Sequence, residues 1–261
     1  MDPLVVATFA VVIFLEIAIP LALGYWIVRR FGVPWRIFAL GALFFIVVQI
    51  VHAPLVLVTQ TPLYLAALPM GTTVAVAVIA VYLGLLAGLF EEVGRYLVYR
   101  YYFRRREIAL TRENALQFGA GWGGVESIFV ALLVLTSMVS YIIITSDGSM
   151  LFLPDDPAVM AQVEAIQAIT PLEIAIGLAE RMMVIPLHIA WSLMVLASIV
   201  YGRKALLALA VVWHAAVDVA AVYLVQMYGL FVTEAAVFVF SVIGVAYILW
   251  EWRRMGVRAA T

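Results

Sequence analysis

The sequence predicts an all-α integral membrane protein, a bundle of about seven transmembrane helices that forms a single domain over residues 1–261. Hydrophobic residues make up 67% of the positions and charged residues only 12%, a composition that a water-soluble domain of this length cannot enclose in one core. Long apolar stretches reach the roughly 20 residues that a helix needs to cross a hydrocarbon core. The alternation typical of membrane-spanning strands is absent, so helices are expected throughout.

Seven apolar stretches are the expected spans, at residues 4–28, 36–58, 72–103, 114–145, 171–201, 205–226 and 231–250. The first begins MDPLVV and runs into Glu16 and Pro20 without a basic region or a small-residue cleavage site. It is therefore expected to be a retained helix and not a signal peptide. Between the fourth and fifth spans, Pro154 and Pro157 open a short amphipathic segment that is expected at the outer interface.

The basic residues predict the orientation, because Lys and Arg are concentrated in cytoplasmic loops. They fill the first, third and fifth loops and follow the last span, whereas the second, fourth and sixth loops contain none. The N-terminus is therefore expected outside and the C-terminus in the cytoplasm, in a multi-pass protein of the plasma membrane. Arg95 and Arg181 are the only basic residues that lie inside expected spans away from the ends next to the basic loops, so each needs another explanation.

Composition also excludes several functions. A formal net charge of −1 gives no indication of nucleic acid as a partner, and the lipid bilayer is the expected environment. The absence of cysteine excludes disulfides, thiol nucleophiles and cysteine-bound zinc, so a metal would need histidine and carboxylate ligands. A retinal receptor would need a lysine within a span, but Lys204 is the only lysine and lies in a loop.

Ionisable residues cluster within four of the expected spans. Each costs roughly 2.5 to 3.5 kcal/mol at the bilayer centre, so such residues are functional candidates by default. At about 1.5 Å of rise per residue, five of them share one slab, about 15 to 22 Å from the nearest cytoplasmic basic residues. These five are Glu91, Glu126, His188, His214 and Asp218. Glu180 and Arg181 fall more than about 30 Å from that boundary and receive less weight.

Two adjacent carboxylates accompany an arginine in the third span. Glu91 and Arg95 share a helix face at i, i+4, and Glu92 reaches Arg95 at i, i+3. One carboxylate can remain ionised beside the guanidinium while the other takes a proton from water. A simple fastener between helices would not need both carboxylates, so the pair is a candidate general base.

The sixth span places His214 and Asp218 on one face, again at i, i+4. They offer two metal ligands, an imidazole oriented by its carboxylate, or only a hydrogen bond between helices. Glu126 and His188 could complete either of the first two arrangements. A metal site of His188, His214 and Asp218, with zinc as the candidate ion, and a metal-free glutamate mechanism therefore both remain open. Glu16 and His52 are interpreted as polar contacts between helices.

Four strings together give the chain a specific resemblance: EEVGRYL, FGAGWGGVES, ERMMVIPLHIAWS and WHAAVDV, in this order. At these strings it resembles the YhfC family of intramembrane metalloproteases, distant relatives of the CAAX prenyl endopeptidases and bacteriocin-processing membrane proteases. The resemblance covers about residues 20–225. It implies proteolysis inside the membrane, on a membrane protein or a lipidated peptide. The implied roles are water activation by Glu91 or Glu92 and orientation by Arg95, with the rest of the centre supplied by Glu126, His188, His214 and Asp218.

One position departs from the wider superfamily. Its second motif is similar to FxxxH, but here Phe118 is followed four residues later by Trp122. Either His188 supplies the missing imidazole, or this member binds without catalysis. Trp122 stands one turn before Glu126, so its indole is expected on the same face and in the volume of that histidine. Low metal occupancy, and activity that resists mild chelation, are expected.

The leading hypothesis is an intramembrane endopeptidase acting on the cytoplasmic side. A proton-coupled transporter is an alternative, because a buried carboxylate and histidine cluster is also a proton relay, although no matching pair of interrupted spans is visible. A catalytically inactive scaffold or membrane chaperone is the other alternative. Two structural expectations follow. Glu91 or Glu92 should line one polar cavity with His188 and His214, open toward the cytoplasm. Arg95 should pair with a carboxylate of its own motif or with Glu126.

Overall fold

The computed structural model describes residues 1–146 and 156–259, which are helical almost throughout. The helices are α1 (Pro3–Phe31), α2 (Arg36–Ala67), α3 (Thr72–Leu97), α4 (Arg112–Thr145), α5 (Pro157–Gln167), α6 (Pro171–Val200), α7 (Lys204–Tyr228) and α8 (Leu230–Ala259). A 3-10 turn (Leu68–Met70) joins α2 to α3, and a π-helical segment (Val98–Phe103) extends α3. Within the described residues, seven helices are long and apolar enough to cross a membrane, all except α5. The all-helical, multi-pass fold is thus confirmed.

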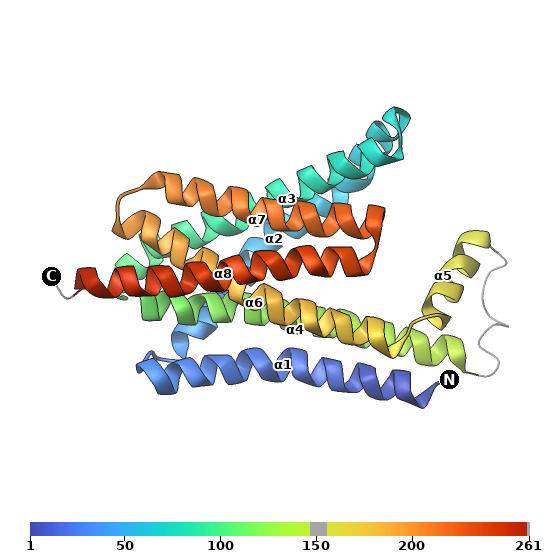
Figure 1. The fold of residues 1–261 in the computed structure, drawn as a ribbon, viewed down its shortest axis with the longest axis horizontal. Coiled ribbons are helices and arrows are strands. Elements are labelled where there is room, and N and C mark those ends of the chain that lie inside the picture. The colour runs from blue at the N-terminus through green and yellow to red at the C-terminus, as the bar shows by residue number, and fades with distance from the viewer. Residues whose placement is uncertain (147–155, 260–261) are drawn as a thin grey trace.

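The described ends of the chain lie at opposite ends of the long axis of the bundle, as an odd number of spans requires (Figure 1). Several helices extend beyond the expected spans. The largest extensions are at the ends of α2 and α8: α2 was expected to end at residue 58 but continues to Ala67 through Pro54 and Pro62, and α8 was expected to end at residue 250 but continues to Ala259. Proline interrupts only the hydrogen bond of its own turn, so a long apolar helix can continue past it.

Capping residues explain where α5 and α6 begin. Asp156 caps α5 by accepting a hydrogen bond from the backbone N–H of Ala158 at 2.7 Å, and Pro157 occupies the first turn. A reciprocal capping box of Thr170 and Glu173 begins α6. The expected short helical segment is therefore present from Pro157. Pro154, its other expected starting point, lies outside the described residues.

The central helix of the bundle is α6. Its most apolar window is 72% buried, against 11–28% for the other six candidate spans. On one side it packs against α4, where glycines permit close approach. A Cβ atom added to Gly119 would lie 2.8 Å from the Cα atom of Ile189, and one added to Gly123 would lie 3.0 Å from the Cβ atom of His188. Gly119 and Gly123 have GxxxG spacing, and their close contacts bring α4 against the histidine of α6.

Candidate functional site

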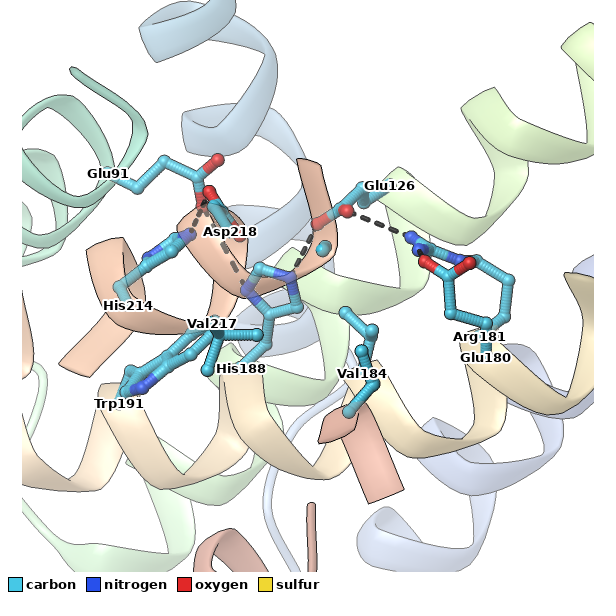
Figure 2. A pocket seen from close by; sticks show the side chains of 12 residues that line it. Glu91, Glu126, Glu180, Arg181, Val184, His188, Trp191, His214, Val217 and Asp218 are labelled. Carbon is cyan, nitrogen blue, oxygen red and sulfur yellow. Dashed lines mark hydrogen bonds and ion pairs between the residues drawn. The ribbon is translucent and has the colours of Figure 1, made fainter. Parts of the chain in front are cut away.

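Four helices bring the ionisable residues into one place in the middle of the bundle. Helix α3 supplies Glu91, Glu92 and Arg95, α4 supplies Glu126, α6 supplies His188, and α7 supplies His214 and Asp218. A cavity of about 100 Å³ lies among them, lined by all of these except Glu92 and Arg95 (Figure 2). The shared depth predicted from the helix rise therefore corresponds to a real convergence of side chains.

Arg95 is completely buried and serves as the central donor of the site. Its guanidinium donates to Glu92, and its Nη2 atom donates to Glu91 Oε2 at 3.3 Å. The same Nη2 atom lies 2.6 Å from His188 Nδ1. The expectation that Arg95 pairs with its own motif is confirmed, and the guanidinium also links α3 to α6.

The contact with Arg95 determines which nitrogen of His188 carries a proton. A guanidinium has donors and no acceptor, so His188 Nδ1 must accept this hydrogen bond. A neutral His188 then carries its proton on Nε2, which faces Glu126 Oε2 at 2.5 Å. Figure 2 shows the His188 imidazole between the carboxylates of Glu91 and Glu126, with Glu126 on its Nε2 side. His188 is therefore oriented from both ends.

The Glu91 carboxylate is held by donors from three helices. Its Oε2 atom accepts from Arg95 and from the indole Nε1 of Trp122, the latter at 2.8 Å. Its Oε1 atom accepts from the side-chain amide of Gln49 on α2 at 3.2 Å. A carboxylate offers about four acceptor positions, so one position on Oε1 remains for a further donor such as water. Glu91 is 5% exposed and lines the cavity.

Glu92 faces a different environment from its neighbour. It is 0% exposed and accepts from Arg95, while His214 Nδ1 lies 2.7 Å from its Oε1 atom. On its other side, His214 Nε2 lies 3.5 Å from Asp218, the expected partner one turn along α7. The His214 ring also stacks on Trp191, with centroids 4.0 Å apart and planes 6° apart. Glu92 thus orients Arg95 and His214, whereas Glu91 reaches the cavity.

Trp122 contributes a hydrogen bond that its position alone did not reveal. Its indole is fully buried and donates to Glu91 across to α3, and the Arg95 guanidinium lies 4.4 Å from a ring centroid. At the position where an imidazole was expected, this chain therefore presents an N–H donor with no ligand atom. The signal that could have identified this role is the polar edge of a tryptophan placed at a motif position.

Gln49 and His52 are site residues that the sequence analysis missed or misread. His52 Nδ1 lies 3.0 Å from Gln49 Oε1, on the same helix, and its ring stacks on Phe90 at 5.3 Å. The polar contact of His52 is therefore made to a residue three positions earlier on its own helix, whereas its contact with a neighbouring helix is the ring stacking on Phe90. His52 thereby orients the amide that donates to Glu91. Two polar residues at i, i+3 in an otherwise apolar span were the available signal.

Glu180 and Arg181 belong to the site despite the low weight that their depth received. Arg181 Nη1 lies 3.0 Å from Glu126 Oε1, Arg181 also pairs with Glu180, and both residues line the cavity. Helix rise gives the depth of the backbone alone. The long side chains of Arg181 and Glu126 together span several ångströms along the helix axis, so they meet although their backbones lie at different depths. Glu16 is 0% exposed, and neither carboxylate oxygen has a hydrogen-bond partner within the described residues.

The cavity extends away from the arginine-rich loops. From His188 its lining continues to Arg181 on α6, Ala221 on α7 and Val237 on α8, all nearer the opposite ends of these helices. The expectation of an opening toward the arginine-rich end, which the loop charges assign to the cytoplasm, is not supported by this lining. Helix rise gave the depth of the residues, but only side-chain packing decides on which side of them space remains.

Three potential metal ligands lie close together. One donor atom each from Glu91, Glu126 and His188 falls within 4.8 Å of the others. Carboxylate oxygen and imidazole nitrogen are donors that zinc accepts, so the set fits a divalent ion in type and spacing. The expected set of His188, His214 and Asp218 shares only His188 with this group, which is the group of such ligands found within the described residues. His214 is instead held between Glu92 and Trp191.

Comparison with known proteins agrees with the motifs. Residues 13–239 match the family described as YhfC intramembrane metalloprotease. The chain is 30% identical over 213 residues to the uncharacterized membrane protein YhfC of Bacillus subtilis (strain 168), which covers 78% of this chain and 79% of the relative. No solved structure matches the chain. Most of the bundle, including every residue that lines the cavity, lies within the matched residues.

Proposed function

Because the chain belongs to the YhfC intramembrane metalloprotease family, we propose that it is an intramembrane endopeptidase of the CAAX-protease-like type. It hydrolyses a peptide bond of a membrane protein or lipidated peptide, using a water molecule activated by a glutamate, in the plasma membrane. The observation that carries the proposal is the pair of differently placed carboxylates. Glu91 faces the cavity with an acceptor position to spare, and Glu92 is fully buried against Arg95 and His214.

Glu91 is the general base in this proposal. It takes a proton from water as the water attacks the scissile carbonyl, and later returns that proton to the leaving amine. Trp122, Gln49 and Arg95 fix the carboxylate, so little reorganisation accompanies the reaction. The guanidinium of Arg181, at the cavity wall, has further N–H donors beyond those that pair with Glu126 and Glu180, and these can stabilise the developing oxyanion.

A metal ion, if present, would be held by Glu91, Glu126 and His188. When bound, it supplies a Lewis acid that polarises the carbonyl and makes water more acidic. His188 would then have to release its Nε2 proton, because Arg95 occupies Nδ1. The positive charge of Arg95 beside this position disfavours a cation. The residues therefore support a metal-free glutamate mechanism at low metal concentration.

The proposal is tested by identifying newly formed peptide N-termini among the membrane proteins of cells that express this chain. Cells expressing the wild-type chain should show new termini within or next to transmembrane segments. Glu91→Gln should abolish them, as should the double variant with Glu92→Gln. Glu107→Gln is the matched control, because Glu107 is exposed and lies in the loop after the π-helical segment. Unchanged termini in the double variant, with the protein folded and present, would overturn the proposal.

A proton-coupled carrier is the second candidate, favoured by one observation. Glu91, His188, Glu126 and Arg181 form a continuous row of ionisable groups along the cavity. Such a row can pass protons as well as position water. Proton flux in proteoliposomes, absent in Glu126→Gln, would favour this function, whereas termini lost in Glu91→Gln without flux favour proteolysis. An inactive scaffold would show neither signal.

A further inference from the structure

A second cavity, of about 560 Å³, lies far along the bundle from the ionisable site. It is formed by the start of α2, by Tyr102 of the π-helical segment and by residues after that segment, at the arginine-rich end. Its polar wall consists of Arg36, Tyr102 and Arg106, and its apolar wall includes Leu40, Leu43 and Ile108. None of its lining residues lines the cavity around His188, so this is a separate space.

An apolar groove of about 350 Å³ adjoins this cavity. Tyr102 lines both, and the groove continues between α2 and α3 past Val47, Val48, Leu97 and Tyr101. Gly94 forms part of its floor, where an added Cβ atom would lie 2.6 Å from a methyl group of Val48. The glycine therefore allows Val48 of α2 to pack closely against α3 at this point of the groove. The exposed side chains of Val47 and Leu97 place the groove on the outer surface of the bundle.

The two arginines of this cavity have no carboxylate to neutralise them. Among the described residues, neither Arg36 nor Arg106 forms an ion pair, although Arg106 lies 5.8 Å from the ring centroid of Tyr102. They belong to the basic end of the bundle, which attracts anionic lipid headgroups. Tyr102 lies in the π-helical segment, a distortion that often accompanies binding sites in helices.

We propose that this composite space binds one anionic phospholipid. Its phosphate lies between Arg36 and Arg106, and one acyl chain follows the groove along Val47 and Leu97. The charge pair selects a negative headgroup, and the adjoining apolar groove selects a chain attached to it. A free phosphate would use only the first feature, and a neutral lipid only the second. A basic pocket between membrane helices with an apolar extension is a recognised arrangement for such lipids.

Thermal unfolding of the full-length purified protein in detergent tests this proposal. The probes are dioleoyl phosphatidylglycerol, dioleoyl phosphatidylcholine and glycerol 3-phosphate. Phosphatidylglycerol should raise the unfolding temperature in a saturable way, while the other two should have little effect. The double variant Arg36→Gln/Arg106→Gln should weaken the apparent affinity for phosphatidylglycerol about 30-fold, from about 1 kcal/mol for each arginine near the membrane surface. Val47→Trp, which fills the groove from an exposed position, should also weaken it.

The matched control is Arg104→Gln/Arg105→Gln, which removes the same charge from exposed residues outside the cavity. This control should retain the wild-type affinity. Equal weakening in both double variants would show a diffuse charge effect and overturn the proposal. If glycerol 3-phosphate raised the unfolding temperature as much as phosphatidylglycerol does, the lipid assignment would be overturned. An unchanged affinity for phosphatidylglycerol in Val47→Trp would overturn it as well. Proteolytic activity does not enter this test, so its outcome is independent of the proposed function.

Discussion

The indole Nε1 of Trp122 donates a hydrogen bond to Glu91 Oε2 over 2.8 Å, so α4 fixes the carboxylate that α3 presents to the cavity. Trp122→Phe removes this donor and keeps most of the ring. It should lower stability by about 1 to 3 kcal/mol, the usual range for a hydrogen bond to a charged group. Proteolytic activity should fall about 10- to 100-fold, as for other partners that orient a reactive group. The unfolding temperature measures the loss of stability, and the formation of new peptide N-termini measures the loss of proteolytic activity. Unchanged activity would contradict the positioning role of Trp122.

Trp122→His should create a metal site. An imidazole at this position would add a nitrogen ligand beside Glu91, Glu126 and His188, where the indole offers none. We expect close to one zinc per chain in this variant after dialysis against zinc, measured by elemental analysis. In the wild-type protein purified without added metal we expect much less than one, and activity that resists mild chelation. Stoichiometric zinc in the wild type, lost together with activity in His188→Ala, would reverse this prediction.

Arg95→Ala should fold poorly. The substitution leaves Glu91 and Glu92 buried without their shared guanidinium, and breaking such a pair costs about 3 to 5 kcal/mol. Yield of monodisperse protein in size-exclusion chromatography is the measurement. Arg104→Ala, at an exposed position nearby, should give a normal yield. A normal yield and normal activity for Arg95→Ala would show that the buried contacts contribute little.

His52→Phe tests the link through Gln49. Phenylalanine retains the stacking on Phe90 but removes the hydrogen bond to the Gln49 amide, which is then free to rotate away from Glu91. Activity should fall several-fold with little change in unfolding temperature. Gln49→Leu should have the same effect, because it removes the donor to Glu91 itself. Additive losses in the double variant would indicate that the two residues act separately.

Gly121→Ala should destabilise the bundle, because a Cβ atom at this position would lie 2.0 Å from the carbonyl oxygen of Phe38. Backbone cannot move aside as a side chain can, so the loss should reach or exceed about 1 to 3 kcal/mol. Gly177→Ala is the control. Its Cβ atom would meet nothing within 4 Å, so alanine should leave stability unchanged or raise it by up to about 1 kcal/mol. Thermal unfolding of both variants in the same detergent compares them.

The sequence by itself determined the class of fold and most of the site. Apolar stretches long enough for a bilayer leave helices as the only economical structure, and rare ionisable residues in them are informative because each is expensive in lipid. Spacing at i, i+4 also predicted the pairing of Arg95 with its own motif. These features depend on helix geometry alone, which is the same in every bundle.

Only the tertiary structure decided how the helices face one another. Three features depend on helix rotation and side-chain direction: Arg181 reaches the site, Trp122 and Gln49 donate to Glu91, and Glu91 and Glu126 lie with His188 in one group of potential ligands. So does the side of the site on which the cavity lies. Periodicity gives the depth and face of a residue on its own helix, whereas contacts across helices are set by packing, including the close approach at Gly123 that brings α4 against His188.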